Sequence, residues 1–232
     1  MMSAKKQVSY SVRPEGDLFA VYRDEAVLET PRNLPVAVAS RKLAEVLAEE
    51  CRSQGDRLDL RKMPMMQMTL TTLDITVAKR DEIEDGIMRF GENELVCLRA
   101  EEPAELAAAQ ETAWRPYLDW AAERFGAVLR TGAGITPPQQ DVAELGKLRE
   151  YVVSCDAYRL TGLSEAVGIS GSLVLGLALA TGHANAHEIV RASEHDQIWQ
   201  MKKWGEDPAV IGRNADIERE LAHCEHWLAL TA

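Results

Sequence analysis

One stretch of the chain is apolar on every side. Residues 171–182 read Gly-Ser-Leu-Val-Leu-Gly-Leu-Ala-Leu-Ala-Thr-Gly and contain no charged side chain. A helix that is apolar all round is buried on every face, and this stretch is well short of the roughly 20 residues that cross a bilayer. The pattern therefore predicts a central core helix that begins at the N-cap Ser170, with Gly168 ending the helix before it.

The segment that follows, residues 185–207, is rich in His, Glu, Asp, Gln and Lys. Asn185 with a glutamate three residues later is typical of a capping box, so the pattern predicts a polar helix that begins there. On that helix Gln197, Gln200 and Trp204 are spaced by three or four residues and share the face that points to the core. Buried amides need hydrogen-bond partners, so this face predicts either a structural network or a binding patch for another molecule.

The first part of the chain has the pattern of strands. Apolar runs at residues 18–22 and 26–28 flank a polar turn, which predicts a hairpin. Residues 34–38 contain a proline and fit an edge strand. Ser40 then caps a helix that Gly55 ends.

From Pro103 onward the periodicity is helical. Residues 94–99 fit a short buried strand that closes the first domain, and Thr136-Pro137-Pro138-Gln139 predicts the start of a helix. The fold class is therefore α+β. We expect residues 1–100 to form a β-rich N-terminal domain with helices, and residues 101–232 to form an all-helical C-terminal domain.

Composition narrows the class of partner. The net charge of −11 argues against nucleic acid and anionic membranes as partners. The four cysteines lie far apart with no C-x-x-C pair, which favours buried free thiols in a reducing compartment. Residues 1–7 have neither an apolar core nor a cleavage site, so we expect no secretory signal and a cytoplasmic location.

Motifs of catalysis and cofactor binding are missing from the sequence. It has no P-loop and no Gly-x-Ser-x-Gly elbow, and the Gly132-x-Gly134 pair lacks the strand–turn–helix context of a dinucleotide loop. His183 and His187 are four residues apart, so one alternative is a small metal-dependent enzyme that uses them with Asp196. A second alternative is a generic scaffold that binds another protein through a methionine-rich surface, residues 63–68.

Several pieces of the sequence, in order, resemble the F(1)-ATPase assembly chaperone family that acts on the alpha subunit of ATP synthase. Two lie in the C-terminal half: Gly171-Ser-Leu-Val-Leu-Gly-Leu-Ala-Leu, and Asp196-Gln197-x-x-Gln200-x-x-x-Trp204-Gly205-x-Asp207. The others are Thr30-Pro31, Met63-Pro64, Gln110-x-x-x-Trp114-x-Pro116-x-Leu118-Asp119-Trp120, and Gly134-Ile135 followed by Gln140.

The resemblance implies a non-enzymatic function. Such a protein is an ATP-independent chaperone that binds the free alpha subunit of F(1)-ATPase and masks its apolar assembly surface until the beta subunit joins. Because the resembled family is non-enzymatic, we expect no catalytic residue, cofactor or metal. The net charge already argues against a nucleic-acid partner, and we expect no membrane insertion. We expect the chain to be monomeric when free and to lie in the cytoplasm of a bacterium or in the mitochondrial matrix of a eukaryote.

The resemblance also implies the binding residues. The family's acidic residue before the Gln-x-x-x-Trp-Gly motif corresponds to Asp196, although the next residue, Gln197, departs from the glutamate that we expect there. Trp204 is expected to pack, and Gly205 to turn the chain. The predicted partner-binding residues are Asp196, Gln197, Gln200, Trp204, Gly205 and Asp207.

Overall fold

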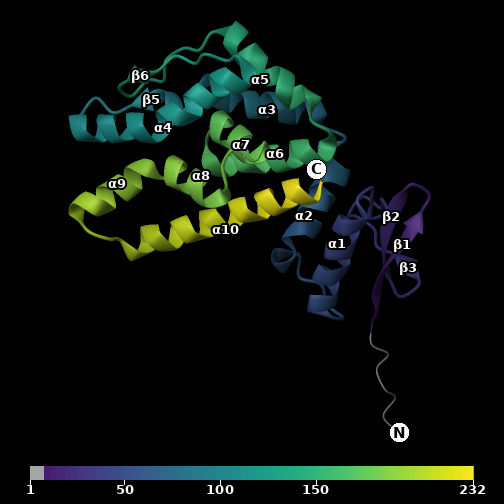
Figure 1. The fold of residues 1–232 in the computed structure, drawn as a ribbon. Helices are drawn as coiled ribbons and strands as arrows, with labels where there is room; N and C mark the ends of the chain where they lie inside the picture. The colour runs from purple at the N-terminus through teal and green to yellow at the C-terminus, as the bar shows by residue number, and fades with distance from the viewer. Residues whose placement is uncertain (1–7, 232) are drawn as a thin grey trace. The chain divides into compact units, whose positions relative to one another are not determined.

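The computed structural model describes residues 8–231, which form two compact units (Figure 1). The first unit contains the chain up to Lys79 together with the C-terminal residues from Trp227, and the second runs from Arg80 to His226. The compact units thus divide the chain between Lys79 and Arg80, and the domain boundary near residue 100 stays a prediction. Residues 1–7, on which the expectation of no secretory signal rests, lie outside the described residues.

A small antiparallel sheet opens the first unit. β2 (Leu18–Arg23) pairs with β1 (Tyr10–Glu15), β3 (Ala26–Val27) and β4 (Ala37–Val38). The predicted hairpin and edge strand are confirmed, and β1 adds a strand that we did not predict individually.

Helix α1 (Arg41–Gln54) packs on β1 and β2. Its ends are the predicted ones, because the Ser40 side chain accepts from the Leu43 backbone N–H and Gly55 ends the helix at φ 71°. On the buried face, Glu50 reaches α2 (Pro64–Thr71) and accepts from the backbone N–H groups of Met65 and Met66 at 2.9 and 2.8 Å. A carboxylate at a helix N-terminus satisfies free N–H groups and complements the helix dipole.

The second unit is mostly helical. Among the described residues, this unit contains one small sheet, in which β5 (Leu98–Arg99) pairs in parallel with β6 (Gly132–Ala133). The prediction that residues 101–232 are all-helical is therefore corrected to mostly helical. Its helices are α3 (Arg80–Glu92), α4 (Ala104–Phe125), α5 (Val142–Ser154), α6 (Ala157–Ser170), α7 (Leu173–Ala180), α8 (Ala186–Ser193), α9 (His195–Trp204) and most of α10 (Pro208–Leu230). The α+β class is confirmed.

Helix α7 is the buried centre of this unit. All eight of its residues are buried, and it packs against α3, α4, α6 and α8 (Figure 1). Its closest neighbour is α6, because Gly176 lets the backbone of α7 approach Val167. The predicted core helix is therefore confirmed, although its N-cap is Ser172 rather than Ser170. Gly168 lies inside α6, which ends instead at Gly171 in the left-handed conformation, φ 68°.

The predicted helix start at Thr136 is wrong. Residues 136–140 form no helix, and α5 begins at Val142 behind the N-cap Asp141. The reason lies in Gln140, whose buried side chain accepts from the backbone N–H of Arg130 and donates to its carbonyl, both at 2.9 Å. This pairing holds the segment extended beside residue 130.

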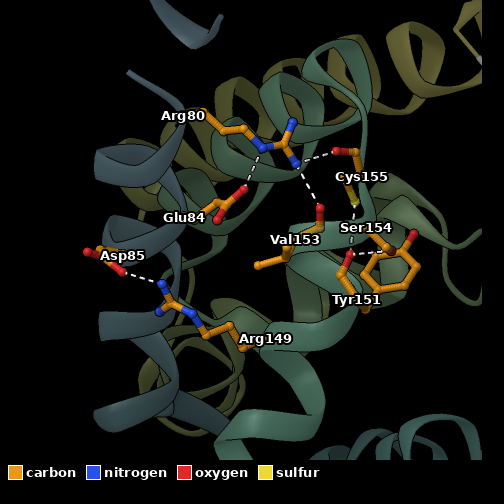
Figure 2. Close-up of polar contacts among 8 residues, drawn as sticks. All are labelled: Arg80, Glu84, Asp85, Arg149, Tyr151, Val153, Ser154 and Cys155. Atoms are coloured by element: carbon orange, nitrogen blue, oxygen red, sulfur yellow. Dashed lines mark hydrogen bonds and ion pairs between the residues drawn. The ribbon is translucent and has the colours of Figure 1, made fainter. Parts of the chain in front are cut away.

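The C-terminal end of α5 is held by an arginine from α3 (Figure 2). Arg80 donates to the carbonyl oxygens of Val153 and Cys155 at 2.8 and 2.6 Å, and forms an ion pair with buried Glu84 at 2.7 Å. Cationic side chains at a helix C-terminus satisfy free carbonyls and complement the dipole. One side chain thus couples α3 to the end of α5.

Candidate protein-binding site

The polar segment after the core helix forms two helices. α8 begins with the predicted capping box at Asn185, but it ends at Ser193, and α9 starts at His195. Glu194 lies at the break, at φ −97° and ψ 20°. Its buried carboxylate pairs with Arg213 of α10 at 3.0 Å, and this distant contact fixes the bend. The prediction of one continuous helix is therefore wrong.

Two side chains of α4 hold this bend in place. Gln110 donates from Nε2 to both carboxylate oxygens of Asp196, at 2.9 and 3.1 Å, while its carbonyl oxygen accepts from the Ala100 backbone N–H at 2.7 Å. One helical turn later, the buried Trp114 donates from Nε1 to the carbonyl oxygen of Ala192 at 2.8 Å. The two contacts connect α4 to the end of α8 and the first turn of α9.

A group of charged side chains lies beside Trp114. The guanidinium of Arg99 lies 5.1 Å from the ring centroid of Trp114. Arg99 also pairs with Glu111 at 3.0 Å, and Glu111 pairs with Arg115 at 2.6 Å. These two arginines hold the pKa of Glu111 below its usual value, Arg115 most strongly.

A cleft of about 470 Å³ lies between α4 and the α8–α9 bend. Helix α9 faces it with His195, Ile198, Trp199 and Lys202, whose spacing of three or four residues places them on one side of a helix. Burial lowers the pKa of His195, and its Nε2 is a buried atom with no hydrogen-bond partner among residues 8–231. The His195 ring meets Trp114 edge-on at 5.8 Å.

The predicted patch residues lie mostly on another side of α9. Gln200 is exposed, Gln197 is half-buried and Trp204 is 70% exposed. The expectation that these amides continue a buried face is wrong for Gln200, and Trp204 is not packed in the core. Trp204 meets Trp199 edge-on, with ring centroids 5.8 Å apart, and Lys203 lies 4.8 Å from the centroid of Trp199.

The last two predicted residues shape the end of α9. Gly205 ends the helix with φ 106° and donates its N–H to the carbonyl oxygen of Met201 at 2.9 Å, as expected for a residue that turns the chain. Asp207 accepts from the backbone N–H of Ala209 at 2.9 Å, at the start of α10. Of the six predicted residues, Asp196 is thus engaged by α4, while Trp204 and Gln200 are open to solvent.

Local sequence reasoning missed the partners on α4 and the tryptophan in the cleft. Gln110 and Trp114 are four residues apart and belong to the motif quoted for the family resemblance, so the sequence alone could have predicted that they share one helix face. Their hydrogen bonds to Asp196 and Ala192 could not be predicted in this way, because they join segments that are far apart in the sequence. No comparable pattern singled out Trp199.

The structure does not assemble the alternative metal site. Within residues 8–231, no three His, Cys, Asp or Glu side chains converge as a metal site would require. His183 stacks on Trp120 at 4.5 Å, His187 pairs with Glu218 at 3.1 Å, and Asp196 is bound by Gln110.

The methionine-rich segment is part of the core of the first unit. Met63, Met65, Met66 and Met68 are all buried. They therefore do not form the open surface that the scaffold alternative requires. No helix among residues 8–231 combines the length and the apolar character that a membrane span needs.

Comparison with known proteins identifies the relatives of this arrangement. Residues 5–122, just over half of the chain, match the family model described as ATP12 chaperone protein. The chain belongs to the ATP12 chaperone family. The crystal structure of Atp12 from Paracoccus denitrificans superposes with a TM-score of 0.91 at 31% identity, over 97% of this chain and 96% of that chain.

Two further proteins are similar to this chain. The Atu1473 protein of Agrobacterium tumefaciens has a TM-score of 0.88 at 26% identity, over 96% of this chain and 84% of that one. Mitochondrial atp12 of Schizosaccharomyces pombe is 22% identical over 197 residues, which is 78% of this chain and 67% of that protein. The ATP12 family consists of non-enzymatic assembly factors for F1-ATPase that act on its alpha subunit. The resemblance seen in the residues is thus confirmed, and the binding roles of the six residues stay predictions.

Proposed function

We propose that this chain is an ATP-independent chaperone that binds the free alpha subunit of F1-ATPase and masks its apolar assembly surface until the beta subunit joins. Membership of the ATP12 family supports the client. The main observation that supports the binding site is that Trp204, at the end of α9, is 70% exposed to solvent. Tryptophan is enriched among the residues that dominate protein–protein binding energy.

The proposed binding surface, the α9 patch, consists of Asp196, Gln197, Gln200, Trp204, Gly205 and Asp207. Trp204 supplies the apolar anchor, and the amides of Gln197 and Gln200 donate and accept hydrogen bonds around it. Gln110 fixes Asp196, so the first turn of α9 is rigid before the client arrives. A rigid site loses less conformational entropy on binding than a flexible one.

The setting of this function follows from the same proposal. The chain acts without nucleotide, cofactor or metal, and it is monomeric until it meets the alpha subunit. It works where F1 is assembled, in the cytoplasm of a bacterium or in the mitochondrial matrix of a eukaryote. Relatives of both kinds, bacterial and mitochondrial, are among the similar proteins.

Co-expression with the F1 alpha subunit of the same organism tests the proposal. We expect a complex that survives affinity purification, more soluble alpha subunit than without the chaperone, and release of the chaperone when the beta subunit is added. The triple variant Gln197→Ala, Gln200→Ala, Trp204→Ala should lose the complex. If the wild-type chain leaves alpha-subunit solubility unchanged and co-purifies with none of it, the proposed function is wrong.

A further inference from the structure

The cleft between α4 and the α8–α9 bend has an apolar floor made of three alanines and two large side chains. Ala109 and Ala113 come from α4, Ala192 from α8, and Ile198 and Trp199 from α9. Alanines at these positions let another backbone come close, while Ile198 and Trp199 offer apolar surface to its side chains.

The charge of the cleft is opposite to that of the whole chain. Arg191 and Lys202 lie on its rim, are exposed, and form no hydrogen bond or ion pair with any residue in the range 8–231. The one carboxylate that lines the cleft, Glu188, accepts from the Asn185 backbone N–H at 2.9 Å in the capping box. In a protein of net charge −11, two unpaired cations beside an apolar floor form a local exception.

We propose that this cleft binds an amphipathic helix of a partner protein, with apolar side chains on the floor and carboxylates paired to Arg191 and Lys202. A helix laid in a groove between two helices is a recurrent mode of recognition, and it satisfies its own backbone hydrogen bonds. Cations aligned with an apolar floor select against a basic amphipathic helix of the same shape. The identity of the partner rests on the proposed function: the helix then belongs to the alpha subunit.

The cleft and the α9 patch are different surfaces of one helix. Ile198, Trp199 and Lys202 face the cleft, whereas Gln200 and Trp204 lie on the other side of α9. A client held in the cleft by an acidic helix could therefore also contact Trp204. The two surfaces make separable contributions to binding.

Two neighbouring lysines provide a matched test. Lys202 lines the cleft, while Lys203 pairs with Glu105 at 3.7 Å and lies over the ring of Trp199. Lys202→Glu and Lys203→Glu make the same change of charge one residue apart. Their thermal unfolding should be measured first, to establish that both variants are folded.

The probes are two synthetic amphipathic helices with leucines on one face, one carrying glutamates elsewhere and the other lysines. Fluorescence anisotropy with the full chain should show binding of the glutamate helix and not of the lysine helix. Lys202→Glu, and more so Arg191→Glu with Lys202→Glu, should weaken binding of the glutamate helix about tenfold or more. Lys203→Glu should change it less than about threefold, and added salt should weaken the wild-type interaction.

The proposal is overturned if the glutamate helix does not bind, if the lysine helix binds equally well, or if Lys202→Glu behaves like Lys203→Glu. The alpha subunit separates this result from the proposed function. If the peptides bind as expected but no complex with the alpha subunit forms, the alpha subunit is not the partner, while the cleft still binds an acidic amphipathic helix. If the double variant Arg191→Glu, Lys202→Glu binds the alpha subunit as tightly as the wild type does, the proposed function stands, but the cleft is not the site that binds this partner.

Discussion

Nε2 of Gln110 on α4 lies within hydrogen-bond distance of both carboxylate oxygens of Asp196 on α9, at 2.9 and 3.1 Å, and donates to this carboxylate. Gln110 is only 3% exposed, so removing the carboxylate takes away the acceptor of a buried donor. The acidic residue singled out by the family motif is therefore, first of all, the partner of a buried amide. Asp196 therefore has two candidate roles: it anchors α9 through Gln110, or it contacts the alpha subunit directly.

Removing the carboxylate should destabilise the protein. We expect Asp196→Ala to lower the free energy of unfolding by about 1–3 kcal/mol, because a buried donor is left unpaired. Asp196→Asn should lose less, since its amide oxygen can still accept one hydrogen bond. Urea denaturation of Gln110→Ala, Asp196→Ala and the double variant measures the coupling, which should exceed about 0.5 kcal/mol. Additive effects would show that the two side chains do not support each other.

Trp204 should behave in the opposite way. Because most of its surface is open, we expect Trp204→Ala to change the free energy of unfolding by less than about 1 kcal/mol. Binding of the alpha subunit, measured by titration of the purified proteins, should weaken about tenfold or more. Ile135→Ala is the control, because Ile135 is 95% exposed on the connection between β6 and α5. Equal effects of the two substitutions on binding would remove Trp204 from the site.

The contact of α6 with α7 gives a test of the core. A Cβ at Gly176 would lie 2.3 Å from Cγ2 of Val167 and 3.0 Å from its backbone N, so Gly176→Ala must push the two helices apart. We expect a loss of about 1–3 kcal/mol in the free energy of unfolding. Gly168→Ala is the matched control on α6, where a Cβ meets nothing within 4 Å and the residue is helical.

The control has its own expected sign. Alanine is the better helix former, so Gly168→Ala should raise the free energy of unfolding by up to about 1 kcal/mol. A loss of stability instead would mean that Gly168 ends a helix, as the sequence pattern indicated. Thermal or urea unfolding of the two variants beside the wild type decides both points.

The parts of the fold that were predictable depend on local signals. The apolar run of α7, the cap and stop of α1 at Ser40 and Gly55, and the capping box at Asn185 can each be read within a few residues. The order of a β-containing part followed by a mostly helical part follows from the change of periodicity along the chain.

The features that local patterns did not predict depend on distant partners. The bend at Glu194 is fixed by Arg213, 19 residues away, and the anchor of Asp196 comes from Gln110, 86 residues away. A pattern on one helix cannot contain these contacts, so it predicts a straight helix with its amides toward the core. The exposed α9 patch and the cleft beside it are consequences of that bend.

Arg80 should be more important for stability than its surface position indicates. Arg80→Ala removes two hydrogen bonds to the end of α5 and leaves buried Glu84 without its cation (Figure 2). Breaking a buried pair costs about 3–5 kcal/mol, and we expect the lower end because the Arg80 side chain is 35% exposed. Arg149→Ala, which breaks the exposed pair with Asp85, should cost less than about 1 kcal/mol. Similar losses in urea denaturation would contradict a capping role for Arg80.

Glu94 should make the stability depend on pH. It is 1% exposed and accepts from the Ser172 hydroxyl and from the backbone N–H of Val174 at the start of α7. Burial raises the pKa of Glu94 from 4.5 to about 7, although these hydrogen bonds oppose the rise. Between these two values the folded protein retains a proton that the unfolded chain has lost, so the free energy of unfolding falls as the pH rises. A shift of this size corresponds to a loss of up to about 3 kcal/mol, complete above pH ~7.

Comparison with Glu94→Gln isolates this contribution. The variant cannot ionise at this position, and its amide hydrogens face the donors that the carboxylate accepts from, so it should be less stable than the wild type at every pH. The difference between the two proteins should shrink as the pH rises from about 5 to 8, because only the wild type pays for a buried charge. Other carboxyls with shifted pKa values, such as Glu50, Glu111 and Glu144, are present in both proteins and cancel in the difference. If urea denaturation shows a constant difference between pH 5 and 8, Glu94 is already ionised at pH 5. The N–H groups at the N-terminus of α7 would then stabilise the carboxylate by more than burial destabilises it.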